Sequence, residues 1–165
     1  MKGRSLLSAI LVGSLIAGSE YAYSAEPHLA TKDVKLSPEL LNLLRAEMRE
    51  ISGGVQGMAL SIATANWESI QETSAKIRAS YIMEKKLTPA QAAELEAALP
   101  EQFKQLDAGF HKRAEKVGTA AAAHDAELVV FQYSRLLESC ATCHSEFAKS
   151  RFPEFSSATH QTHHH

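Results

Sequence analysis

The chain has only two cysteines, and both lie in the stretch Cys140-Ala141-Thr142-Cys143-His144. C-x-x-C-H is the attachment pattern of a c-type haem. In such a motif the two thiolates add to the haem vinyl groups, and the imidazole becomes an axial ligand of the iron. On a helix, positions i, i+3 and i+4 share one face. We therefore predict one covalently attached haem c, with Cys140 and Cys143 as thioether anchors and His144 as the proximal iron ligand.

Three other interpretations of the two cysteines have weaker support. A thioredoxin-like redox pair uses C-x-x-C beside a strand-helix unit, but the sequence shows no convincing strands. A structural zinc site needs about four ligands, and no second cysteine pair is available to complete one. A plain disulfide or a chance match to the motif also stays open at this stage.

Composition and charge narrow the classes of function. With 165 residues, of which 45% are hydrophobic and 22% charged, the chain matches an ordinary soluble single domain. A net charge of -2 and the lack of a polybasic stretch argue against nucleic acid or an anionic membrane surface as a partner. No nucleophile-base pair, phosphate-binding glycine loop or pair of catalytic carboxylates can be recognised, so we expect a protein that is not an enzyme.

Residues 1–24 have the pattern of a secretory signal peptide. Two basic residues precede an apolar stretch from Leu6 to Ala17, which is too short to span a bilayer comfortably. The small residues that follow predict cleavage after Ser24 or Ala25. An uncleaved membrane anchor is the alternative. Because c-type cytochromes are assembled outside the cytoplasm, export and the haem motif together predict a periplasmic protein.

Capping residues and apolar side chains at alternating spacings of three and four predict an all-α chain with four helical regions. Pro100 must kink or split the third region. The inward face of the fourth region includes both cysteines, which places the haem inside the fold near its end. The predicted regions start at Pro38, Trp67, Pro89 and Ala126, the second and fourth end near Lys85 and Ser150, and the N-caps are Ser37, Asn66, Thr88 and Asp125.

With these helices and the C-x-x-C-H motif on the last of them, the sequence resembles the cytochrome c prime family. Phe147, three residues after His144, and the run Met48-Arg49-Glu50-Ile51 before a group of glycines also carry the resemblance. It implies an antiparallel four-helix bundle that holds the haem between its helices. The first-helix run is similar to that of low-spin members, in which a methionine is the sixth iron ligand. The family also includes homodimers.

We assign residues 37–152 to this cytochrome domain. Residues 25–36 form a lead-in segment before it, and residues 153–165 form a polar tail that contains four histidines and is expected to be disordered. A metal-binding role of this tail is an alternative with little support.

Met48 is the predicted distal iron ligand, because it lies on the apolar stripe of the first helix where the resemblance places that ligand. A methionine on such a stripe is more often a core gap-filler. Met58 and Met83 are weaker candidates because they lie further from the expected position. His111 and His124 could also ligate iron, although a lone histidine on a helix is more often solvated.

The sixth ligand separates two functions. Methionine opposite histidine suits a one-electron carrier between periplasmic redox proteins, with a moderately positive reduction potential. An open or displaceable sixth position instead suits a protein that binds nitric oxide or carbon monoxide. The prediction for this chain is the electron carrier, with gas binding as the alternative. Arg45 and Arg151 are candidates for contacts with the haem propionates, because the guanidinium fork suits carboxylates.

Overall fold

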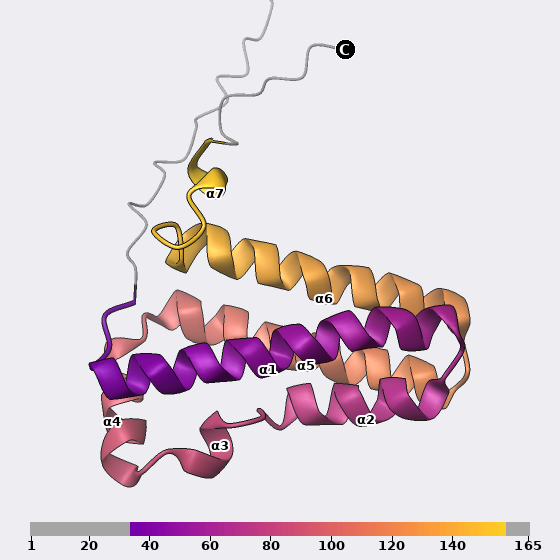
Figure 1. The fold of residues 1–165 in the computed structure, drawn as a ribbon, viewed down its shortest axis with the longest axis horizontal. Coiled ribbons are helices and arrows are strands. Elements are labelled where there is room, and N and C mark those ends of the chain that lie inside the picture. Colours follow the sequence, from indigo (N-terminus) through magenta and orange to yellow (C-terminus); the bar gives the residue numbers. More distant parts are fainter. Residues whose placement is uncertain (1–33, 158–165) are drawn as a thin grey trace, which may run out of the picture. The chain divides into compact units, whose positions relative to one another are not determined.

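The computed structural model of the chain describes residues 34–157. The predicted signal peptide and the histidines after residue 157 lie outside this range. All regular secondary structure within it is helical, which confirms the all-α prediction (Figure 1). The elements are α1 (Pro38–Ala63), α2 (Trp67–Arg78), α3 (Met83–Lys86), α4 (Pro89–Ala98), α5 (Glu101–Ala122), α6 (Ala126–Phe147) and α7 (Glu154–Ser157).

All four predicted N-caps accept a hydrogen bond from a backbone N–H in the first turn of their helix. The Thr88 side chain and Gln91 form a complete capping box at the start of α4. These caps use backbone donors that have no partner within the helix. The bonds join Ser37 to Leu40 N (3.4 Å), Asn66 to Ser69 N (3.1 Å), Thr88 to Gln91 N (3.3 Å) and Asp125 to Leu128 N (2.9 Å).

The second helix is shorter than predicted. It ends at Arg78 instead of near Lys85, and Ser80 then takes a left-handed conformation with φ of 50°. The next three backbone N–H groups donate to the carboxylate of Glu47 on α1, so they do not continue the helix. The prediction failed here because a long-range side-chain contact ends α2, and local sequence pattern does not show such a contact.

Two further boundaries concern prolines. Pro100 splits the third helical region into α4 and α5, as expected. The last long helix ends at Phe147, not near Ser150, because the N–H groups of Arg151 and Phe152 both turn back to the Ala148 carbonyl oxygen at 3.0 Å. Pro153 disfavours helical backbone at the residue before it, which is consistent with this earlier stop.

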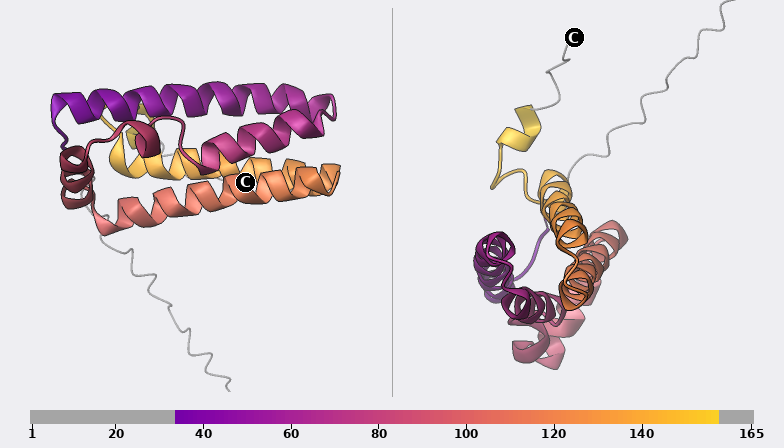
Figure 2. Two further views of the ribbon diagram at one scale, coloured as in Figure 1. Left: turned by 90° about the horizontal axis from the view of Figure 1, so that it is seen from below. Right: turned by 90° about the vertical axis from the view of Figure 1, so that its right-hand side faces the viewer.

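Helices α1, α2, α5 and α6 form a four-helix bundle (Figure 2). α5 packs along α2 on one side and along α6 on the other, and α2 also packs against α1. The first and last long helices run antiparallel but make only sparse contact with each other. The bundle is therefore tightly packed on three of its four sides and loosely closed between α1 and α6.

The fully buried core occupies only part of the bundle. Its contiguous cluster contains no residue of α1 before Ile51, none of α5 before Ala114 and none of α6 after Leu136, and Leu40 is buried apart from this cluster. These three helices all extend for several turns beyond that core, toward the end of the bundle at which α4 lies (Figure 1). The C-x-x-C-H motif belongs to this less densely packed end.

Candidate functional site

The last two turns of α6 carry the cysteine-histidine motif. Cys140, Cys143 and His144 are all half-buried, and they continue the buried stripe that Val129 and Leu136 begin. Both thiols are free, and the Cys140 thiol donates a weak hydrogen bond to the Leu136 carbonyl oxygen at 3.6 Å. One helix thus brings together the three side chains that the sequence predicts to hold the haem.

Burial changes the proton affinity of these groups. It raises the pKa of the Cys140 thiol, and it raises the pKa of Cys143 to about 11, with a smaller contribution from the negative charge of Asp107. Burial also lowers the pKa of His144, which favours the neutral imidazole. A neutral imidazole has the lone pair that a metal ion needs, so the lowered pKa favours the form of His144 that can bind iron.

Aromatic side chains surround the motif. Phe147 meets Phe103 of α5 edge to face, with ring centroids 5.3 Å apart. The His144 ring stacks on Phe152, which follows the end of α6, at 4.6 Å and an interplanar angle of 23°. The guanidinium carbon of Arg151 lies 6.0 Å from the centre of the Phe152 ring. The turn after α6 therefore folds back so that Phe152 packs against the predicted proximal ligand.

A hydrogen bond between α1 and α6 shows which residues face the motif. The Tyr133 hydroxyl donates to the Val55 carbonyl oxygen at 2.9 Å. Met48 lies seven residues before Val55, and Cys140 lies seven residues after Tyr133. Seven residues are about two helical turns and about 10 Å of rise. Because the two helices are antiparallel, Met48 and Cys140 lie at the same height along the bundle.

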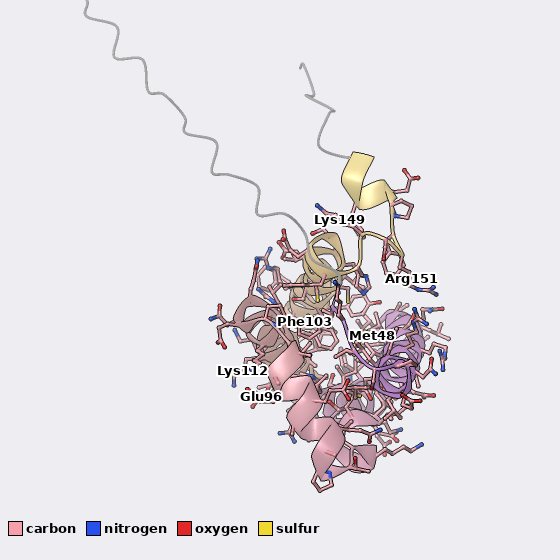
Figure 3. All side chains as sticks on the ribbon, turned by 90° about the vertical axis from the view of Figure 1, so that its left-hand side faces the viewer. Met48, Glu96, Phe103, Lys112, Lys149 and Arg151 are labelled. Carbon is pink, nitrogen blue, oxygen red and sulfur yellow. The ribbon has the colours of Figure 1, made fainter. Side chains whose placement is uncertain are left out.

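Met48 is less buried than its position on the apolar stripe predicted. The buried side chains of α1 are Leu40, Glu47, Ile51, Val55 and Met58, whereas Met48 is 39% exposed. Its position, two turns from Val55, is on the flank of α1 that faces α6. Figure 3 looks onto this end of the bundle and labels Met48 of α1 and Phe103 of α5.

The residues at this end fit a large apolar group. The fully buried core stops before the motif is reached, and several apolar side chains beyond it are only half-buried. A planar macrocycle between α1 and α6 would cover these side chains and remove their apolar surface from water. The half-buried side chains are Leu41 and Leu44 of α1 and Phe103 and Leu106 of α5.

The two arginines predicted to contact propionates differ in their surroundings. Arg151 lies next to Phe152, and therefore close to His144. Arg45 is exposed on α1, three residues before Met48. Neither arginine forms an ion pair within the described part of the chain, so both guanidinium groups are available to a carboxylate.

The other candidate ligands lie in different environments. Met58 is fully buried in the core, and Met83 lies on the short helix α3. His111 approaches the Ile77 carbonyl oxygen at 2.8 Å through its Nδ1 atom. His124 stacks on Trp67 at 5.4 Å, in the turn that precedes α6, and so at the opposite end of that helix from the motif.

Sequence reasoning missed two residues of this region. The first is Glu47, which is almost fully buried. The sequence does contain a signal of its burial, because Glu47 is a charged residue on the apolar stripe that contains Leu40, Ile51 and Met58. Phe152 was treated only as the boundary of the domain. Its stacking on His144 depends on the turn at Ala148, which the pattern of the sequence does not reveal.

No helix in the part of the chain that the structure describes is both long and apolar enough to cross a bilayer. No group of three or more histidine, cysteine, aspartate or glutamate side chains in residues 34–157 is arranged to hold a metal ion.

A C-x-x-C-H motif on the inward side of a helix, in a four-helix bundle whose core stops short of it, defines a c-type cytochrome of the helical-bundle class. The family model for Cytochrome C' matches residues 33–148, and the chain belongs to this family. The resemblance found in the sequence is thereby confirmed. Cytochrome c' proteins bind haem c, so this protein is a haem-binding c-type cytochrome. Comparison with curated proteins and with solved structures gave no match.

Proposed function

We propose that the protein is a monohaem, one-electron carrier that exchanges electrons with periplasmic redox proteins. In this proposal Cys140 and Cys143 hold the haem covalently, His144 is the proximal iron ligand and Met48 is the distal ligand. The observation that carries it is the position of Met48, on the α6-facing flank of α1 and level with the motif through the Tyr133–Val55 hydrogen bond.

The bound haem supplies an iron centre that can gain and lose one electron. The chain contributes the neutral imidazole of His144, the apolar surface around the motif and the Met48 thioether. A neutral thioether and an apolar environment both stabilise the ferrous form relative to the more highly charged ferric form. We therefore expect a moderately positive reduction potential. In this proposal the exposed Arg45 and Arg151, the latter next to Phe152, neutralise the propionate charges.

Optical spectra of the oxidised and reduced protein test the proposal. Ferric haem with methionine and histidine ligands shows a weak far-red charge-transfer band, and we expect this band in the wild-type protein. Met48→Leu keeps the apolar volume but removes the sulfur, so the band should disappear and the ferric spectrum should become high-spin. Met83→Leu is the matched control, because Met83 is half-buried on α3, and it should leave the spectrum unchanged.

The same variants distinguish the electron carrier from a gas-binding protein. A wild-type protein with a high-spin ferric spectrum, and with rapid binding of carbon monoxide or nitric oxide in the ferrous form, would overturn the electron-carrier proposal in favour of gas binding. If Met48→Leu keeps the far-red band, Met48 is not the sulfur ligand. Retention of the haem on a denaturing gel tests the covalent attachment separately.

A further inference from the structure

Glu47 is the most deeply buried charged residue in the described part of the chain, with 2% of its surface exposed. One carboxylate oxygen accepts a hydrogen bond from the Tyr81 N–H at 2.7 Å. The other accepts from the Ile82 N–H at 2.5 Å and from the Met83 N–H at 3.1 Å. Three successive backbone donors therefore surround one carboxylate. Charge-assisted bonds of this kind are stronger than bonds between neutral groups.

A second contact joins the same two parts of the chain. Gly54 lies seven residues after Glu47, and therefore on the same side of α1. A Cβ atom at this position would collide with the Tyr81 hydroxyl and press against the Thr73 methyl group. The absence of a side chain at residue 54 allows Tyr81 to lie directly against α1. The segment between α2 and α3 is thus attached to α1 at two points two turns apart.

These contacts matter because the first half of α1 has little buried apolar packing, in which Leu40 is the one fully buried apolar side chain. The contiguous buried cluster includes no residue of α1 before Ile51, Leu40 is buried apart from that cluster, and α1 contacts α6 only sparsely. Two sets of hydrogen bonds add to the packing of Leu40 in this half. The Glu47 contacts are one set, and the other is formed at the start of the helix, where the Ser37 N–H and hydroxyl donate to the Glu94 carboxylate of α4 at 2.7 and 3.0 Å.

Glu47 and Met48 are consecutive residues, so their side chains leave α1 about 100° apart around the helix axis. When the Glu47 carboxylate is held on the side of α2 and α3, Met48 is directed toward α6. Rotation or sliding of α1 would break the three hydrogen bonds to Glu47. We infer that Glu47 is a positioning residue that fixes the rotation of α1 and so holds the Met48 thioether toward the haem. This inference rests on the proposed role of Met48 as distal ligand.

The test is Glu47→Gln in the haem-loaded protein. Glutamine keeps the size of the side chain but replaces one acceptor oxygen with an amide NH₂ group, which cannot accept from these N–H groups. We expect the variant to lose the far-red band wholly or in part, to have a lower reduction potential and to bind carbon monoxide in the ferrous form. Glu50→Gln removes a negative charge from an exposed position of the same helix, and should change none of these properties.

Gly54→Ala provides a second route to the same result if Glu47→Gln does not fold. It leaves the carboxylate in place but displaces Tyr81, and we expect a weaker far-red band in the folded protein. The inference is overturned if either variant folds, as judged by circular dichroism, and keeps the wild-type band, potential and inertness to carbon monoxide while Met48→Leu loses the band. An unchanged spectrum in Met48→Leu overturns the proposed function itself, and the role of Glu47 with it.

Discussion

The hydroxyl group of Tyr133 on α6 donates a 2.9 Å hydrogen bond to the carbonyl oxygen of Val55 on α1. This bond crosses the most loosely packed side of the bundle, where the two helices otherwise make sparse contact. The bond therefore sets how far α1 is shifted along α6. Because Met48 and Cys140 are each seven residues from it, the same bond aligns the predicted distal ligand with the motif.

Tyr133→Phe removes this hydrogen bond and keeps the ring. The Val55 carbonyl still has its partner within α1, so no buried acceptor is left unsatisfied. We expect the free energy of unfolding to fall by about 0.5–1.5 kcal/mol, the usual net contribution of one hydrogen bond. Urea denaturation measures this change. Ser134→Ala is the control, because the Ser134 hydroxyl is exposed and bonds only to the Phe131 carbonyl of its own helix. An equal effect of the two substitutions would show that the α1–α6 bond contributes nothing specific.

Two adjacent leucines of α6 test where the packed core ends. Leu136 is fully buried one turn before Cys140, whereas Leu137 is 42% exposed. Leu136→Ala should destabilise the protein by about 2–5 kcal/mol, because it leaves a cavity in the core. Leu137→Ala should change the free energy of unfolding by less than about 0.5 kcal/mol, as most exposed substitutions do. Denaturation curves of the two variants measure the difference, and similar values would contradict the assigned burial.

Most helix starts could be predicted from local sequence because they depend on residues within one turn. Ser37, Asn66, Thr88 and Asp125 cap their helices through a donor three residues ahead, and Pro100 ends a helix by its own geometry. The end of α2 could not be found in this way. It depends on Glu47, which lies more than thirty residues earlier in the chain, and no periodicity in α2 itself reports that contact.

The same distinction applies to the candidate site. The spacing of Cys140, Cys143 and His144 is local, so the sequence could place them together on one helix. Whether Met48 faces them depends on the rotation of α1 relative to α6, which the apolar stripe left undetermined. That stripe predicted Met48 to be in the core, but the buried position next to it is occupied by Glu47, and Met48 lies toward the opening between the helices.

Loss of the haem should loosen one end of the bundle more than the other. The double variant Cys140→Ala/Cys143→Ala removes both proposed covalent anchors, and the motif end lies outside the contiguous buried cluster, with Leu40 as its one fully buried apolar side chain among the described residues. Hydrogen exchange followed by mass spectrometry should therefore be faster than in the haem-loaded protein in residues 38–48 and 101–110. Segments 114–122 and 129–136 should keep their protection. Uniform loss of protection along the whole chain would contradict a core that is independent of the haem.

The stability of the protein should depend on the protonation of His111. The Nε2 atom of this histidine lies 3.6 Å from the Asp107 carboxylate, and its Nδ1 atom lies 2.8 Å from the Ile77 carbonyl oxygen. Asp107 is the main cause that raises the pKa of His111 above its ordinary value of 6.5, and the partial burial of the ring opposes this shift. The Ile77 carbonyl and the more distant Glu47 carboxylate also favour the charged form.

Because the pKa of His111 is higher in the folded than in the unfolded chain, the folded protein binds the proton more tightly. The resulting stabilisation is complete below the unfolded value of 6.5 and is lost as the pH rises through the higher folded value. We therefore expect the free energy of unfolding to decrease across this window. Asp107→Asn removes the main cause of the shift, so its stability should depend less on pH there. Urea denaturation of both proteins over this range measures the effect, and parallel pH profiles would show that Asp107 does not raise the pKa of His111.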